Sequence, residues 1–85
     1  MGLGVEKRMA LLSGWIEERA AANGAAGSVV TADWFSHTKR WTARLHHGTD
    51  IVVRVESGRL MDAMRDLWTA TQKRWPNAVT VRVPL

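Results

Sequence analysis

The chain has 85 residues, a formal net charge of +4 and no cysteine. A chain of this length forms one domain, so we predict a single small α+β unit over residues 1–85. The lack of cysteine excludes disulfides and thiolate metal sites, and no run of about 18 apolar residues predicts a membrane span. Together these features predict a small basic protein that is soluble and cytoplasmic.

Residues 3–22 predict an amphipathic helix. Apolar side chains recur at helical spacing along one stripe, formed by Val5, Met9, Leu12, Ile16 and Ala20. Leu11 and Trp15 lie well to one side of this stripe, so they either widen the buried face or form a second, exposed apolar patch. Asn23 and Gly24 then give a signal for the end of the helix.

Residues 28–36 permit two interpretations. Their β-branched residues favour a strand, whereas Thr31 followed by Asp33 is also compatible with a short, capped helical turn. We predict a strand that leads into the next two strands. The side chains of this strand expected to face the core are Val30, Ala32 and Trp34.

Residues 40–56 predict a β-hairpin, because apolar and polar residues alternate on both sides of a polar break that contains Gly48. We choose the register that keeps all apolar residues on one face. On that face it pairs Leu45 with Ile51, Ala43 with Val53, and Trp41 with Val55. On the opposite face it pairs Arg44 with Val52, Thr42 with Arg54, and Arg40 with Glu56.

Ser57 is the expected N-cap of a second helix over about residues 58–75, which Pro76 ends. The apolar arc of this helix is formed by Leu60, Met64, Leu67, Trp68, Thr71 and Trp75. Alternating valines over residues 79–83 predict a final strand. Its neighbour in the sheet is left open between the first and the third strand.

The predicted order is therefore α-β-β-β-α-β, with an antiparallel sheet of three or four strands and both helices packed on one face. The first five elements resemble the α-β-β-β-α order of double-stranded-RNA-binding domains. That family carries a lysine-rich cluster at the start of its second helix, where it meets phosphates. Here the only basic residues within 58–65 are Arg59 and Arg65, and the acidic Asp62 lies between them. The resemblance is thus one of topology, which does not carry function.

The sequence shows no set of residues typical of catalysis. A predicted strand of about 30 Å separates His37 from His46 and His47, so these histidines are not expected to share a metal ion. The serines lie in no nucleophile motif, the paired carboxylates lie on helix surfaces, and no glycine-rich phosphate loop follows a strand. We therefore predict a protein that is not an enzyme and that has no metal and no cofactor.

The outward face of the predicted sheet is the first candidate site. Its residues are Arg40, Thr42, Arg44, Arg54 and Arg82. Arginine forms bidentate contacts with carboxylates and phosphates. Because Trp34 and Trp41 are expected to face the core, this face should lack the stacking aromatics that single-stranded nucleic acids require.

We therefore predict a small non-enzymatic binding protein, such as an adaptor, accessory factor or inhibitor, that contacts an acidic protein partner. The alternative is nucleic-acid binding, in which the same arginines contact phosphates. A second candidate site is the patch formed by Leu11 and Trp15, which would bind a protein partner or a second copy of the chain in a homodimer.

Overall fold

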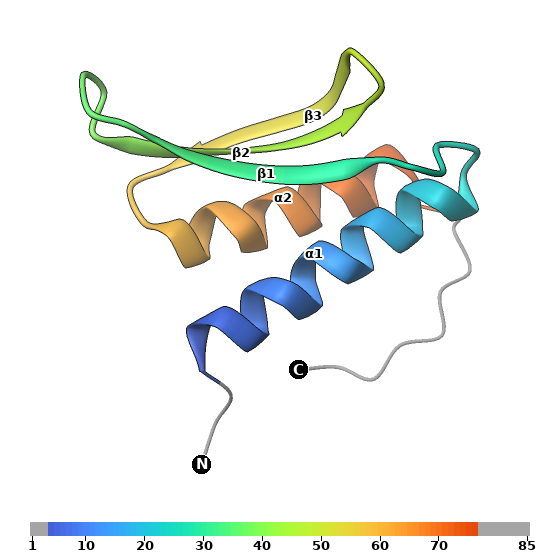
Figure 1. The fold of residues 1–85 in the computed structure, drawn as a ribbon, viewed down its shortest axis with the longest axis horizontal. Coiled ribbons are helices and arrows are strands. Elements are labelled where there is room, and N and C mark those ends of the chain that lie inside the picture. The colour runs from blue at the N-terminus through green and yellow to red at the C-terminus, as the bar shows by residue number, and fades with distance from the viewer. Residues whose placement is uncertain (1–3, 77–85) are drawn as a thin grey trace.

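The computed structural model describes residues 4–76, which form two helices and a three-stranded antiparallel sheet. The elements are α1 (Val5–Ala22), β1 (Val29–Phe35), β2 (Arg40–His47), β3 (Asp50–Ser57) and α2 (Leu60–Arg74). The strand order is β1-β2-β3, and both helices lie on the same side of the sheet (Figure 1). The predicted α+β class is confirmed, while the expected strand over residues 79–83 lies outside the described residues.

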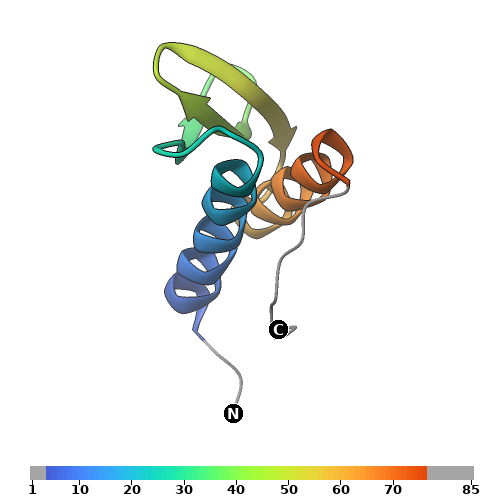
Figure 2. The ribbon, with the colours of Figure 1, turned by 90° about the vertical axis from the view of Figure 1, so that its right-hand side faces the viewer.

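The core lies between the sheet and the two helices, which run side by side beneath it (Figure 2). Its fully buried residues come from both helices and from the central strand: Leu12, Ile16, Ala20, Ala43, Leu45, Ala63, Met64 and Leu67. The predicted stripe of the first helix is thus buried from Leu12 onwards. Val5, at the start of that stripe, is half exposed because α1 begins there.

The end of α1 is a Schellman motif, as Asn23 and Gly24 predict. Gly24 has a φ of +86°, a conformation that glycine adopts without steric cost. Its N–H donates to the carbonyl of Ala21 at 3.2 Å, and the N–H of Ala25 donates to the carbonyl of Ala20 at 2.9 Å. The buried Ala25 then turns the chain back towards β1.

β1 is a strand, so the short helical turn considered for residues 28–36 is excluded. Its residues Val30, Ala32 and Trp34 share the helix side with Trp41, as predicted, and they lie opposite Leu45, Ala43 and Trp41 respectively. The rings of Trp34 and Trp41 lie 5.7 Å apart between centroids and are tilted by 56°. Trp34, which we expected in the core, is 47% exposed, because it lies on the edge strand and contacts the end of the helix side through Trp41.

The predicted register between β2 and β3 is wrong by two residues. In the structure Leu45 lies opposite Val53, Ala43 opposite Val55, and Trp41 opposite Ser57. One residue of this difference comes from the turn, because the two-residue loop Gly48-Thr49 is shorter than the polar break that we assumed. Gly48 has a φ of +62°, the sign that tight hairpin loops require at their first central residue.

A β-bulge separates this tight turn from the rest of the hairpin. The turn places Ile51 opposite His46, and the register then shifts because Val52 is an extra residue on β3. Without that shift the same register would direct Arg54 towards the helices. The bulge keeps the following valines on the core side, but it leaves Ile51, which we expected in the core, 50% exposed on the other face.

The start of α2 also differs from the prediction. Ser57 is the last residue of β3 and lies opposite Trp41, so it does not cap the helix. α2 begins at Leu60 after the extended residue Arg59, and no side chain caps it. The predicted apolar arc is confirmed by the burial of Met64, Leu67 and Thr71.

Candidate partner-binding surface

The face of the sheet that points away from the helices carries most of the predicted binding residues. We call it the outer face. It consists of Val29, Thr31, Asp33 and Phe35 from β1, Arg40, Thr42, Arg44 and His46 from β2, and Ile51, Arg54 and Glu56 from β3. These residues share a face because directly opposed residues of antiparallel strands project to the same side.

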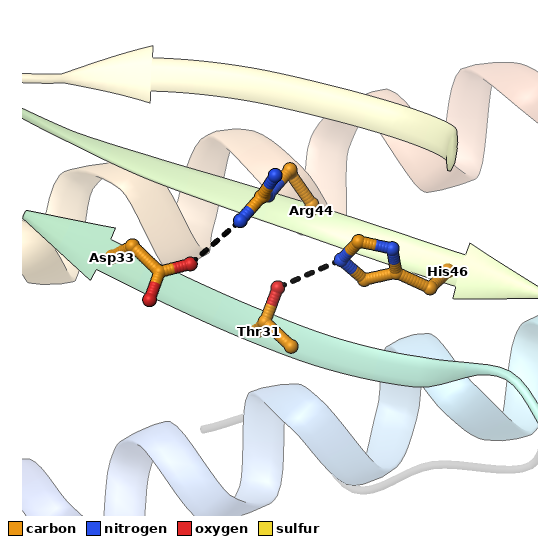
Figure 3. Close-up of polar contacts among 4 residues, drawn as sticks. All are labelled: Thr31, Asp33, Arg44 and His46. Atoms are coloured by element: carbon orange, nitrogen blue, oxygen red, sulfur yellow. Dashed lines mark hydrogen bonds and ion pairs between the residues drawn. The ribbon is translucent and has the colours of Figure 1, made fainter. Parts of the chain in front are cut away.

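Two ion pairs lie on the outer face. An Nη2 of Arg44 donates to Asp33 Oδ2 at 2.7 Å (Figure 3), and Nη2 of Arg54 donates to Glu56 Oε1 at 3.0 Å. Arg44 and Arg54 lie directly opposite each other, contrary to the predicted register. Each guanidinium therefore has its own carboxylate, which offsets the repulsion between these two cations.

Thr42 shows how closely these side chains cover the centre of the outer face. It lies opposite Asp33 on one side and Glu56 on the other. No helix covers it, yet it is only 2% exposed, and its Oγ1 has no hydrogen-bond partner among the described residues. The neighbouring charged side chains therefore lie over the sheet, and Thr42 is not available to a partner without their movement.

The end of the outer face near the β2–β3 turn is apolar. Thr31 Oγ1 and His46 Nε2 are 2.9 Å apart and form a hydrogen bond between β1 and β2 (Figure 3). Val29 and Ile51 flank His46 on the two neighbouring strands and are 54% and 50% exposed. We call these three residues the Val29–His46–Ile51 row, and we did not predict it from the sequence.

Phe35 corrects the expectation that this face lacks aromatic side chains. It lies opposite Arg40 on the outer face and is half-buried. Its ring is in edge contact with the ring of His37, with centroids 6.0 Å apart. The strand alternation that places Trp34 on the helix side places Phe35 on the outer face, so the pattern contained this signal.

The structure brings Arg40, Thr42, Arg44 and Arg54 together on one face, as the alternation of the hairpin predicts. Arg40 is exposed at the end near the β1–β2 turn, and no ion pair involves it within residues 4–76. Arg82, the fifth residue of the predicted site, lies outside the described residues.

The second predicted surface, formed by Leu11 and Trp15, lies beside the seam between the two helices. The rings of Trp15 and Trp68 are 6.0 Å apart, and the guanidinium of Arg19 lies 5.5 Å from the centroid of the Trp68 ring. Arg19 Nε also donates to the carbonyl of Trp75 at 3.1 Å. Trp15 thus widens the buried face of α1, and Leu11 is 39% exposed.

The histidines are separated as the sequence suggested. His37 lies in the β1–β2 turn, whereas His46 and His47 lie at the far end of β2. Among residues 4–76, no group of three histidine or acidic side chains is placed so that it could hold a metal ion.

Neither helix of the described part is long and apolar enough to cross a membrane. Comparisons with protein-family models, with curated proteins and with solved structures found no match for this chain.

Proposed function

We propose that this chain is a small, non-enzymatic binding protein that docks on a protein partner through its outer face. The observation that carries the proposal is the Val29–His46–Ile51 row, in which two exposed aliphatic side chains flank a hydrogen-bonded imidazole. Arginine side chains adjoin this row. Protein interfaces combine apolar patches of this kind with arginine and other polar residues around them.

The charges of the outer face favour a protein partner over a nucleic acid. Three arginines lie on this face with two carboxylates, and both carboxylates are in ion pairs. A polyphosphate would gain little from arginines that are already paired, and it would be repelled by Asp33 and Glu56. Binding of nucleic acids through phosphates depends on cations that are free to replace counterions.

Arg40 indicates which chemical group the proposed partner presents to the outer face. It is the outer-face arginine that has no ion-pair partner in the described part of the chain, and Phe35 lies opposite it. A carboxylate of the partner would form a bidentate contact there. The partner we propose therefore presents an apolar patch to the Val29–His46–Ile51 row and an acidic group to Arg40.

Affinity capture from an extract of the native host, read by mass spectrometry, tests this proposal. The full chain carrying Ile51→Glu should lose the protein that the wild-type chain captures. Thr69→Glu, which introduces the same charge on the exposed surface of α2, is the matched control and should retain it. Equal capture by the wild-type chain and Ile51→Glu would overturn the proposal.

Nucleic-acid binding is the alternative, and Phe35 is the observation in its favour, because a ring beside an arginine is able to stack on a base. Fluorescence anisotropy with labelled single-stranded and duplex DNA and RNA at low salt decides between the two. We expect no binding. Tight binding that weakens steeply with salt, and that the pair Arg44→Glu and Arg54→Glu abolishes, would replace our proposal with this alternative.

A further inference from the structure

The two edges of the sheet differ in how they are protected against pairing with another strand. β3 has a bulge at Val52 and three charged residues, namely Asp50, Arg54 and Glu56. β1 has one charged residue, Asp33, whose carboxylate is held on the outer face by Arg44, and it has no bulge, proline or lysine. Bulges and charges are the usual devices that stop edge strands from pairing, so within residues 4–76 the strand residues of the β1 edge carry fewer of them than those of the β3 edge.

The backbone of β1 presents hydrogen-bonding groups at this edge. The N–H of Val30 donates to Glu17 Oε2 of α1 at 3.1 Å, so it points away from β2. Because backbone direction alternates along a strand, the N–H and C=O groups of Ala32 and Trp34 point the same way. Within residues 4–76 neither of these two N–H groups donates a hydrogen bond to a side chain or to another element.

We propose that a second copy of this chain pairs with β1 in an antiparallel arrangement, about a twofold axis that passes through Ala32. This arrangement places Ala32 opposite Ala32 of the second copy, and the N–H of Val30 would exchange Glu17 Oε2 for a backbone carbonyl of that copy. Val30 lies opposite Trp34 of the second copy, Thr31 opposite Asp33, and Val29 opposite Phe35, and each of these pairs occurs twice. No two like charges meet, and the pairs of a β-branched with an aromatic residue are of the kind that stabilises sheets.

The exposed side chains of β1 support a second copy of the chain as the partner of this edge. Val29 and Trp34 are 54% and 47% exposed, and the proposed pairing would cover both. The helix side leaves room for the second copy near Glu17, because the α1 residues within two turns of Glu17 on the same side are small. These residues are Ala10, Gly14 and Ala21, and all three are exposed. The two sheets would join into one six-stranded sheet, an isologous interface of the kind found in most dimers.

The dimer does not rest on the proposed function, because backbone groups at the edge of the sheet would form it; of the Val29–His46–Ile51 row it would cover only Val29. Light scattering and sedimentation equilibrium on the full chain over a range of concentrations test it. The mass should rise from that of the 9.5 kDa monomer to twice that value. A chain that stays monomeric at the highest concentration would overturn the proposal.

Two variants locate the interface. Ala32→Pro removes an N–H that the described monomer does not use, while proline is tolerated at the free side of an edge strand. Trp34→Ala removes the ring that would cover Val30 of the second copy. Both should remain monomeric at concentrations at which Ile51→Ala, a truncation near the other edge, still dimerises. A dimer that survives both changes would exclude this edge, and circular dichroism confirms that the variants are folded.

A direct contact can also be measured by NMR. Within one strand the four-residue step from Val30 to Trp34 spans about 13 Å, which is too far for a nuclear Overhauser effect between their side chains. Such an effect between Val30 and Trp34, seen in a mixture of labelled and unlabelled chains, therefore reports the proposed pairing. If the mixture dimerises without it, the twofold axis is not at Ala32 and this pairing is wrong.

Discussion

The two faces of β2 show how one strand divides its residues between stability and surface chemistry. On the helix side Ala43 and Leu45 are completely buried between β1, β3 and the helices. On the outer side Arg44 and His46 make polar contacts with β1. Because these residues alternate, neighbouring positions of one strand should respond very differently to substitution, and this difference can be measured.

The largest effect should come from Leu45→Ala, which leaves a cavity at the centre of the core. Truncation of a fully buried leucine costs about 2–5 kcal/mol, and a domain of 85 residues has little stability to lose. Urea denaturation followed by tryptophan fluorescence measures the loss. Arg44→Ala, the neighbouring outer-face variant, should cost less than about 1 kcal/mol. Similar losses in the two variants would show that β2 does not separate its faces in this way.

A smaller effect should follow from deleting Val52. This deletion tests whether the bulge is needed to keep the apolar residues of β3 on the core side, given the register that the turn sets. Without the extra residue the register set by the Gly48 turn already places Ile51 outside and Val53 opposite Leu45. We expect the fold and both faces to persist, with a loss of about 1 kcal/mol from the partly buried valine. Cross-strand nuclear Overhauser effects between Val53 and Leu45 check the register. Their disappearance would mean that the bulge itself determines which residues face the core.

This bulge also marks the limit of what the sequence could predict. The placement of both helices and of the hairpin strands follows from apolar periodicity, which the core enforces through burial, and the strand over residues 28–36 follows from its β-branched residues. The β2–β3 register does not, because two constraints disagree: the tight loop at Gly48 favours one register and the apolar face favours another. An extra residue resolves the conflict, and no single alternating pattern contains it.

The candidate site was predicted to a similar extent. Alternation alone places Arg40, Arg44 and Arg54 on one face, so their shared location could be predicted from the sequence. Their pairing with carboxylates could not, since it depends on the register and on diagonal contacts such as the one between Arg44 and Asp33. The exposure of Ile51 was missed for the same reason, because it is a consequence of the bulge.

The contact between α1 and α2 provides a prediction with an effect of intermediate size on stability. Trp15 and Trp68 are in contact between the two helices, so their interaction should contribute to stability in addition to the core contacts of β2. A double-mutant cycle with Trp15→Leu and Trp68→Leu should give a coupling energy of about 0.5–1.5 kcal/mol. Thermal unfolding of the four proteins measures this energy. A coupling near zero would mean that the rings share the seam without stabilising it, and would favour a role for Trp15 in binding a partner.

The smallest effect on stability, and the most informative one for function, should come from Asp33→Asn. This change removes the carboxylate that binds Arg44 but preserves the shape of the side chain. Exposed ion pairs contribute about 0.2–1 kcal/mol and are screened by salt, so the unfolding midpoint should hardly move and the difference should shrink further in high salt. The freed guanidinium of Arg44 makes the outer face more basic. If the outer face binds an acidic protein, the affinity of the captured partner should therefore increase, whereas a scaffold face with no partner would show only the small change in stability.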